Sequence, residues 1–457
     1  MTRVLIVGAG PAGIRAAEVL AGAGLCPTVV DEGARAGGQI YRRPPLGFGR
    51  TPEKLYGSEA GKARALHGRF DWLVAQGKVW HLPETSVLAL RDGVAHVLGE
   101  TRRQIPYDRL ILATGATDRL APVPGWQNAG VYSLGAAQIA LKAQGVALGR
   151  QIVLAGTGPL LTLLAMQLRA AGAGLVAVLD TAPMRDQLRG GLAMAAARPV
   201  VALRGVSMRA RLGNLYHAGV TLERIEADPD HGVQALHWRN ARGQSHRTAC
   251  DMAALGWHLR AETHLADLAG AEFDWCPSAR QWLVRCDDMG RAGKDLYLAG
   301  DGQRLLGADG AELAGRLAAI ALLRDLGRPA PAAYGLLRRR ARMQRFANAM
   351  ARAFPWPAEA VAALPDDTVI CRCEGVTAGT LRATLPASGP EANRAKALSR
   401  VGMGRCQGRY CQLAGAEIIA ADQGLAVPRA GRLRAQPPAR PAPIGAWLST
   451  PPEREAE

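Results

Sequence analysis

Four of the eight cysteines of this 457-residue chain lie within 41 residues of one another, towards its C-terminal end. Cys371 and Cys373 form a C-x-C pair, and Cys406 and Cys411 form a C-x4-C pair after a gap of 32 residues. Four thiolates can bind a structural zinc ion or a [2Fe–2S] cluster. Structural zinc sites usually space their cysteines as C-x2–4-C, and C-x-C is too close for that habit. The spacing therefore favours a [2Fe–2S] cluster, with zinc and plain thiols as the alternatives.

Three glycines around the second cysteine pair bear on the same chemistry, namely Gly402, Gly404 and Gly408. Cysteines two apart in an extended segment point the same way, and a glycine-rich turn can curl the other two cysteines around the same centre. The backbone amides of these glycines would then be free to donate hydrogen bonds to sulfur.

A glycine-rich turn at the start of the chain has the spacing of a dinucleotide-binding fingerprint. It follows an apolar, β-branched run, precedes a helix-patterned stretch, and consists of Gly8, Ala9, Gly10, Pro11, Ala12 and Gly13. In a strand–turn–helix unit these glycines permit the tight turn, the close approach of a pyrophosphate and the packing of helix on strand. The amides at the helix N-terminus then point at the phosphates. An acid about 20 residues on, Asp31 or its neighbour Glu32, is placed to accept from a ribose hydroxyl.

Three later segments indicate that the dinucleotide is FAD. The paired glycines of Gly37-Gly38-Gln39 suit a chain that passes close beneath a large flat cofactor, as in flavoproteins. A buried strand ends in Ala113-Thr114-Gly115, which resembles the turn beside FAD in two-dinucleotide-domain flavoprotein reductases. In that family, an aspartate matching Asp301 of Gly300-Asp301 hydrogen-bonds the ribityl chain, and the next helix directs its N-terminus at the flavin. Cys-x-x-Cys is absent from the sequence, so we do not expect a dithiol–disulfide reductase.

A second fingerprint contains Gly156 and Gly158 and is followed by a helix and a strand that ends in Asp180. An acid at this position favours NAD over NADP, because it accepts from a free 2′-hydroxyl. Leu161 occupies the place of the third glycine. The two interpretations left open are an NAD site and a Rossmann-like unit that has lost its nucleotide or holds one only structurally.

The composition gives a formal charge of +17 with 48% hydrophobic residues, which fits a large globular protein. The arginines are scattered, apart from a cluster at 338–345 on a helix-patterned stretch, and we favour solvated helix faces or an acidic protein partner over nucleic acid. No apolar run is long enough for a membrane span, and the first strand begins at the N-terminus, so we expect no signal peptide and a cytoplasmic protein.

The order of the strands and helices expected around these residues predicts an α/β fold with two Rossmann-like domains and a small four-cysteine domain. We expect an FAD-binding domain from 1–120 and 290–330, with an NAD(P)-type domain inserted at 121–289. A basic linker helix at 331–362 then leads to a [2Fe–2S]-binding domain at 363–425. The Pro-, Arg- and Ala-rich tail at 426–457 is expected to lack fixed structure.

With these motifs in hand, the chain resembles the NAD/FAD-binding large subunits of bacterial opine oxidase, D-hydroxyproline dehydrogenase and hydrogen cyanide synthase, and part of the sarcosine oxidase α subunit. The resemblance reaches to about residue 425, and its most specific part is Cys-x-Cys-Glu followed by Gly-Met-Gly-x-Cys-Gln-Gly-Arg-x-Cys. The chain departs from that family at Leu161 and at Gly256-Trp257-His258. The resemblance implies a hetero-oligomer with a second FAD-containing dehydrogenase subunit, which oxidises the amino or imino acid, and with a small [2Fe–2S] protein.

The leading hypothesis from sequence is thus an FAD- and iron–sulfur-containing subunit that relays electrons from a partner acting on a C–N bond. The first alternative is a self-sufficient NADH-dependent reductase of a ferredoxin-like acceptor, which needs NAD bound at the second fingerprint. The second alternative is a non-enzymatic scaffold that holds zinc and a nucleotide. The sequence leaves the catalytic residues unidentified.

Overall fold

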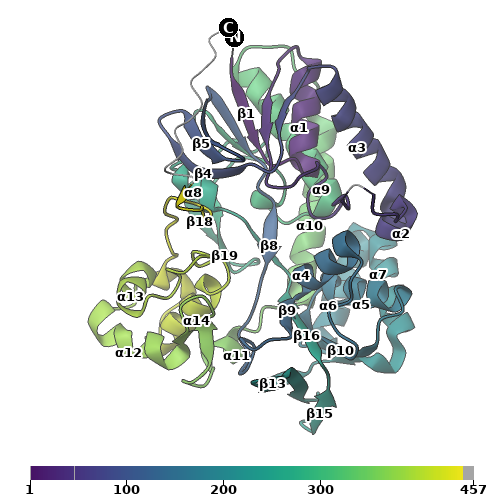
Figure 1. The fold of residues 1–457 in the computed structure, drawn as a ribbon, viewed down its shortest axis with the longest axis vertical. Coiled ribbons are helices and arrows are strands. Elements are labelled where there is room, and N and C mark those ends of the chain that lie inside the picture. Colours follow the sequence, from purple (N-terminus) through teal and green to yellow (C-terminus); the bar gives the residue numbers. More distant parts are fainter. Residues whose placement is uncertain (1, 46, 446–457) are drawn as a thin grey trace.

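The computed structural model describes residues 2–45 and 47–445. The first unit is built on a five-stranded parallel sheet with the order β20-β7-β1-β2-β3 (Figure 1). Its strands are β1 (Val4–Val7), β2 (Thr28–Val30), β3 (Trp80–Leu82), β7 (Arg109–Leu112) and β20 (Leu296–Leu298). The apolar run of β1 is buried throughout, as expected for a strand covered on both faces.

Alternate residues of the first sheet face two different layers. Ile6 belongs to the core beneath the helices, whereas Leu5 belongs to the core beneath an antiparallel meander. The helices are α1 (Pro11–Gly22), α3 (Ala60–Ala75) and α9 (Gly307–Asp325). The meander consists of β4 (Ser86–Arg91), β5 (Val94–Leu98) and β6 (Arg102–Pro106). Two short helices complete this part, α2 (Pro52–Tyr56) and α8 (His264–Leu268), and Leu265 and Ala266 of α8 belong to the core beneath the meander.

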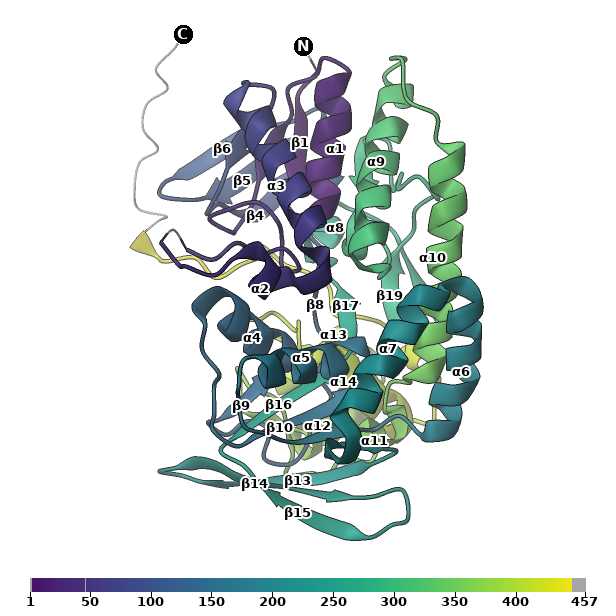
Figure 2. The same cartoon turned by 90° about the vertical axis from the view of Figure 1, so that its right-hand side faces the viewer.

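The second unit is a separate five-stranded parallel sheet with the order β12-β11-β10-β16-β9, below the first in Figure 2. Its strands are β9 (Val131–Ser133), β10 (Ile152–Thr157), β11 (Leu175–Asp180), β12 (Tyr216–Ala218) and β16 (Met252–Trp257). Its helices are α4 (Leu134–Ile139), α5 (Pro159–Ala170), α6 (Met184–Ala197) and α7 (Pro199–Leu212). An antiparallel sheet completes it, with β13 (Thr221–Asp228), β14 (Gly232–Arg239) and β15 (Ser245–Ala249).

The chain passes between the two units along a pair of antiparallel strands, β8 (Ala116–Asp118) and β17 (Leu259–Ala261). One more hairpin, β18 (Phe273–Cys276) with β19 (Gln281–Val284), precedes the return to β20. The second unit therefore interrupts the first between β7 and β20. The expected α/β class with two Rossmann-like sheets is confirmed, while the exact domain boundaries stay a prediction.

After α9 the chain forms the expected basic helix, α10 (Tyr334–Ala353), which packs on α6 and α9. The C-terminal unit follows, shown at the lower left of Figure 1. Its elements are α11 (Ala358–Ala362), β21 (Val369–Cys371), β22 (Val376–Thr377), α12 (Ala378–Ser388), α13 (Ala392–Ser399) and α14 (Gln412–Asp422). Among the described residues, no helix combines the length and apolar character needed to cross a bilayer.

The segment after residue 425 differs from the expectation of a tail without fixed structure, as far as residue 445. Arg432 forms an ion pair with Asp267 at 2.6 Å, and the amide of Ala439 donates to the carbonyl of Leu88 at 2.7 Å. Ala439 is buried against the meander side of the first sheet. The composition suggested disorder because it shows few apolar residues, but ion pairs and backbone hydrogen bonds hold this segment. Residues 446–457 lie outside the described residues.

Helices α1 and α9 of the first unit approach each other very closely. A Cβ at Gly315 of α9 would lie 2.0 Å from the carbonyl oxygen of Ala12, which belongs to the first turn of α1. The backbone there has no room for any side chain.

We therefore expect Gly315→Ala to destabilise the protein by about 1–3 kcal/mol, because α9 must move away from α1. The matched control is Gly68→Ala in the middle of α3, where a Cβ meets nothing within 4 Å. That change should raise stability by roughly 0.5–1 kcal/mol through helix propensity. Urea unfolding of both variants measures the difference, and equal effects of the two changes would refute the tight contact.

Candidate functional site

Four segments that the sequence singled out meet where the strands of the first sheet end. They are the fingerprint, the paired glycines and the two later turns. A Cβ at Gly8 would lie 2.3 Å from the carbonyl oxygen of Ala113, and one at Gly38 would lie 2.9 Å from Cα of Gly10. A Cβ at Gly300 would lie 2.8 Å from Cβ of Ala12. We call this set of turns, from Gly8, Gly10, Gly38, Thr114 and Gly300, the glycine junction. It contains bare backbone from four chain segments far apart in sequence.

Asp31 and Glu32, between which the sequence did not decide, have different surroundings. The Asp31 carboxylate accepts from the amide of Ala9 at 2.5 Å and from the amide of Gly33 at 2.7 Å. Burial raises the pKa of Asp31 against the lowering effect of these two amides. Glu32 is instead bound to Arg440 of the C-terminal segment at 2.5 Å. Asp31 is thus the acid that contacts the fingerprint turn directly.

Asp301 lies at the start of the loop that leads into α9. Its carboxylate accepts from the amide of Leu306 at 3.0 Å, next to the first residue of the helix. Burial raises the pKa of Asp301 to about 6, although the amides of Leu306 and Gly307 lower it. A Cβ at Gly302 would lie 2.9 Å from Oγ1 of Thr114, so this loop also touches the Ala-Thr-Gly turn.

The residues of the glycine junction fit FAD. Gly10 is the N-cap of α1 with Pro11 as first helical residue, so the free amides of that first turn point out of the helix end. A Cβ at Gly38 would collide with Gly10, so the two backbone segments can lie this close together only because Gly38 has no side chain. Backbone amides, a helix dipole and two buried carboxylates are the donors and acceptors that a pyrophosphate with polyol chains requires.

The second fingerprint has the expected strand and helix, but its polar groups are engaged inside the protein. Asp180 is 1% exposed, and it accepts from Thr157 Oγ1 and from the Tyr216 hydroxyl, each at 2.6 Å. The amide of Ala182 adds a third hydrogen bond at 2.9 Å. Both carboxylate oxygens of Asp180 are therefore occupied, which does not fit an acid that holds a ribose.

His258 covers the glycine of the same fingerprint. A Cβ at Gly158 would lie 2.8 Å from Nδ1 of His258, which itself has a positive φ of 63°. Burial lowers the pKa of His258 to about 4, so the ring is neutral at pH 7. Its Nε2 lies 2.7 Å from the carbonyl oxygen of Phe354, which directly follows α10. The departure at Gly256-Trp257-His258 thus ties the second fingerprint to the linker helix.

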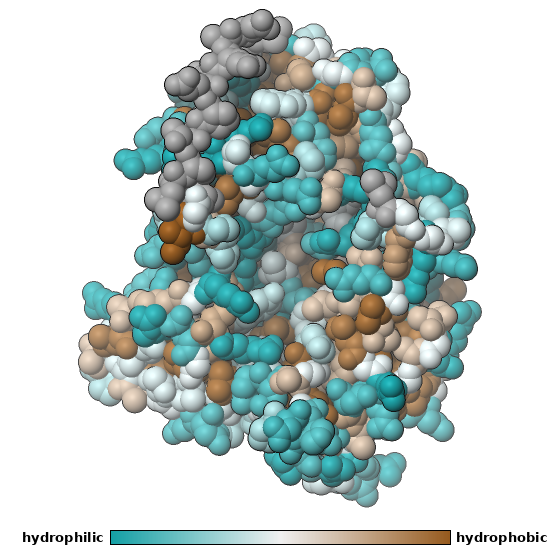
Figure 3. Space-filling view, viewed as in Figure 1, coloured by the Kyte–Doolittle hydropathy of each residue, from teal (hydrophilic) through white to brown (hydrophobic). Residues whose placement is uncertain are grey.

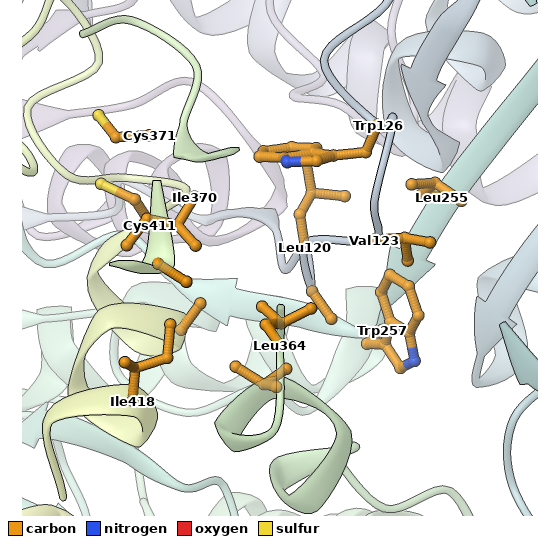
Figure 4. Close-up of a cluster of buried hydrophobic side chains, with 14 of the residues drawn as sticks. Leu120, Val123, Trp126, Leu255, Trp257, Leu364, Ile370, Cys371, Cys411 and Ile418 are labelled. Carbon is orange, nitrogen blue, oxygen red and sulfur yellow. The ribbon is translucent and has the colours of Figure 1, made fainter. Parts of the chain in front are cut away.

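The four cysteines gather in the C-terminal unit as two pairs. The Cys411 thiol hydrogen-bonds the Cys371 sulfur, and Figure 4 shows these two sulfurs on the same side of the surrounding core. Cys373 and Cys406 form the other hydrogen-bonded pair. The bond from Cys411, together with backbone amides that include Gly402, lowers the pKa of Cys371 to about 6.

All four thiols also act electrostatically on one another, because the charges of Cys371, Cys373 and Cys406 each raise the pKa of Cys411. Within the described residues, however, no three His, Cys, Asp or Glu side chains stand in the arrangement of a ligand set around one metal ion. The structure brings the predicted cysteines together as hydrogen-bonded thiols.

A buried ion pair that the sequence did not reveal connects the cysteines with the glycine junction. Arg409 Nε donates to Glu262 Oε2 at 2.8 Å, with the two side chains 7% and 4% exposed. The backbone of Glu262 bonds the Ala-Thr-Gly turn twice, from its amide to Gly115 and from Thr114 Oγ1 to its carbonyl at 2.7 Å. Arg409 also donates to the carbonyl of Cys406 at 3.3 Å.

The charge of this pair is fixed by its surroundings. Burial alone would raise the pKa of Glu262, but Arg260 and Arg409 outweigh it and lower the pKa to about 2. Arg260 is 1% exposed and lies 3.9 Å from the carboxylate. Only Arg409 carried a sequence signal, as part of the cysteine motif; Glu262 and Arg260 lie in a stretch without recognisable chemistry.

The chain is similar to known proteins over almost its whole length. Residues 2–315 match the family described as pyridine nucleotide-disulphide oxidoreductase. An opine oxidase subunit from Rhizobium meliloti is 34% identical over 463 residues, covering 98% of this chain and 87% of the relative. Hydrogen cyanide synthase subunit HcnB of Pseudomonas protegens is 32% identical over 89% of each chain.

Among solved structures, L-proline dehydrogenase from P. horikoshii superposes with a TM-score of 0.72 at 18% identity, covering 97% of this chain and 80% of that one. Thioredoxin reductase from T. acidophilum superposes with a TM-score of 0.53 at 17% identity, covering 71% of this chain and 99% of that one. At these identities the likeness concerns the fold.

The raised pKa of Asp301 leads to a pH-dependent stability. The folded protein holds the proton more tightly than the unfolded chain, so ionisation of this buried carboxyl costs stability above about pH 6 and costs nothing below about pH 4. In FAD-free protein we expect Asp301→Asn to be more stable than wild type at pH 7.5, by at most about 3 kcal/mol. The advantage should vanish towards pH 4. Denaturant unfolding at both pH values, with Glu100→Gln as an exposed control, measures it; a pH-independent difference would contradict the assignment.

Proposed function

The chain belongs to the pyridine nucleotide-disulphide oxidoreductase family, together with its opine oxidase and HcnB relatives, and from this premise we propose that it is the electron-relaying subunit of a multi-subunit dehydrogenase. It is an FAD-dependent oxidoreductase, and the proposed reaction of the whole enzyme is oxidation of a C–N bond in an amino or imino acid. The observation that carries the proposal is the buried Arg409–Glu262 pair, which couples the glycine junction to the four-cysteine segment.

We assign FAD to the glycine junction. Gly8, Gly10 and Gly13, with Pro11 and Ala12 between them, would hold the pyrophosphate at the start of α1. Asp31 would accept from the ribose and Asp301 from the ribityl chain. The turns that would flank the flavin ring contain Gly38, Gln39, Ala113, Thr114 and Gly115. Bound there, FAD supplies two-electron chemistry that can be divided into single-electron steps.

The start of α9 has a further role in this assignment. The Asp301 carboxylate accepts from the amide of Leu306, the N-cap of this helix, so the positive end of the helix dipole lies beside the proposed flavin site. Negative charge that grows on the cofactor during reduction would be stabilised by this helix end. The carboxylate of Glu262 is held ionised between Arg260 and Arg409. The backbone of the same residue bonds the Thr114–Gly115 turn and so keeps that turn in place.

A [2Fe–2S] cluster is our proposal for the four cysteines, Cys371, Cys373, Cys406 and Cys411. Three features support it: the two sulfur pairs interact with each other, amides such as that of Gly402 donate to sulfur, and Cys371 has a pKa low enough to be a thiolate at neutral pH. Such a cluster supplies one-electron transfer. Arg409 would fix the turn that carries Cys406 relative to the flavin side.

The relatives also support a division of labour. The opine oxidase relative and HcnB are each named as one subunit of an enzyme, and sarcosine oxidase, whose α subunit is 26% identical over 72% of this chain, is another such enzyme. We therefore assign oxidation of the amino or imino acid to a second FAD-containing subunit, with a small [2Fe–2S] protein as a further partner. This chain would receive the electrons.

A direct test is the visible spectrum and metal content of the purified full-length chain. We expect one FAD and about two iron atoms with two sulfides per chain, since four thiolates complete a [2Fe–2S] centre. Cys406→Ser should lose the iron and keep the FAD, whereas Cys276→Ser, outside the cluster, should keep both. A colourless chain with bound zinc would reject the relay, and so would substrate oxidation by this chain alone.

NADH is the second candidate electron source, since the second unit has the Rossmann topology that binds it. The internal hydrogen bonds of Asp180 and the position of His258 argue against it. We expect NADH to bleach the flavin no faster than it bleaches free FAD, measured by anaerobic stopped-flow absorbance. Asp180→Asn should leave this result unchanged. Rapid bleaching by NADH that is lost in Gly158→Val would establish the self-sufficient reductase instead.

A further inference from the structure

Two consecutive helices of the second unit carry large aliphatic side chains in water. On α6, Leu188 and Leu192 are 63% and 77% exposed and lie one helical turn apart. On α7, Val200, Leu203 and Val206 are 64%, 70% and 65% exposed. We call these five residues the aliphatic face. Figure 3 shows hydrophobic residues gathered at the lower right of the molecule, where Figure 1 places α5, α6 and α7.

The opposite sides of the two helices are already packed. A Cβ at Gly190 of α6 would lie 2.5 Å from Cβ of Ala353, so α6 rests directly on α10. Helix α7 packs against α6 and α5 and buries Leu212 at its end. The three exposed residues of α7 follow one another at three-residue steps, which keeps them within about 120° of the helix circumference. The aliphatic face thus consists of five large exposed side chains on two helices that contact each other, α6 and α7.

The charged residues around the aliphatic face indicate which kind of protein surface could dock on it. Residues 184–212 contain six arginines and one acid, Asp186. Arg185, Arg189, Arg204 and Arg211 are exposed on the same two helices. Arg185 lies 3.8 Å from Asp186 and Arg204 lies 3.5 Å from Glu59, but both arginine side chains stay more than half exposed, at 77% and 58%. A second copy of this chain would set arginines against arginines across the contact. A surface with an apolar centre and an acidic rim satisfies both the aliphatic residues and the arginines.

We propose that the aliphatic face is the docking surface for the second FAD-containing subunit, and this assignment rests on the proposed function. The structure connects the surface to the flavin side of the molecule. Arg198, between α6 and α7, pairs with Asp309 at 2.7 Å, and Asp309 lies in the first turn of α9. Lys62 holds the same carboxylate at 2.9 Å. A protein docked on α6 and α7 would therefore adjoin the helix whose N-terminus faces the proposed flavin site.

The test is co-expression of the full-length chain with the second flavoprotein subunit of its own enzyme, followed by affinity measurement with the purified proteins. We expect Leu192→Glu combined with Leu203→Glu to weaken the complex at least tenfold, because carboxylates would replace the apolar centre and face an acidic rim. Arg189→Glu combined with Arg204→Glu should also weaken it. Wild-type affinity should fall as salt rises, and the arginine double variant should show a smaller salt dependence.

Leu398→Glu on α13 is the matched control, since Leu398 is 55% exposed but belongs to the C-terminal unit. It should leave the affinity unchanged, and all variants should keep the wild-type FAD content and melting temperature. Wild-type affinity in both double variants would overturn the docking surface while leaving the proposed function intact. So would a chain that is dimeric alone and becomes monomeric in Leu192→Glu/Leu203→Glu. If the wild-type chain binds no second flavoprotein subunit, the proposed function itself fails.

Discussion

The arrangement of this protein depends on one buried ion pair, between Arg409 and Glu262. Its carboxylate and guanidinium are shielded from water, and Arg260 adds a second positive charge beside them. Removing one partner of such a pair leaves an uncompensated charge, at a cost of about 3–5 kcal/mol. The pair joins the Thr114–Gly115 turn to the cysteine segment, and Arg409 also donates to Ala439 of the C-terminal segment at 3.0 Å. The relative position of the two proposed redox sites is therefore set by electrostatics inside the protein and not by a flexible linker.

The sequence predicts the parts of the site that depend on neighbours along the chain. The fingerprint from Gly8 to Gly13 predicts its strand, turn and helix, and the close contacts of Gly38 with Gly10 follow from backbone geometry that only glycine permits. The sequence also contains the four cysteines as two local motifs, but each hydrogen-bonded pair, Cys371 with Cys411 and Cys373 with Cys406, joins one motif to the other. Glu262 could not be predicted, since its partner Arg409 is 147 residues away and nothing around it marks a site. Long-range pairing of buried charges is a property of the folded topology, which spacing along the chain does not contain.

The two Rossmann units share a local sequence pattern, but the acid of each pattern has different surroundings. At the first, Asp31 receives two backbone amides from the fingerprint turn and its neighbourhood. At the second, Asp180 occupies the equivalent strand end but is bound by the hydroxyls of Thr157 and Tyr216. Neither hydroxyl belongs to the fingerprint glycines, so a motif search assigns Asp180 the same role as Asp31. These two side chains come from the next strand and from the turn itself, and they hold the Asp180 carboxylate inside the second unit.

The ion pairs of the arginines show where the large positive charge lies and why the C-terminal segment is ordered. Arg432 and Arg434 both bind Asp267, and Arg440 binds Glu32, so a segment whose composition predicts disorder is held along the first unit by ion pairs. Each of these arginines has its countercharge within the chain. The exposed arginines of α6 and α7 stand next to aliphatic side chains and close to a single acid in their own segment. The net charge of +17 is thus distributed unevenly, because many arginines are paired within the chain, including Arg204 with Glu59, while the exposed arginines of α6 and α7 still place positive charge next to the aliphatic face.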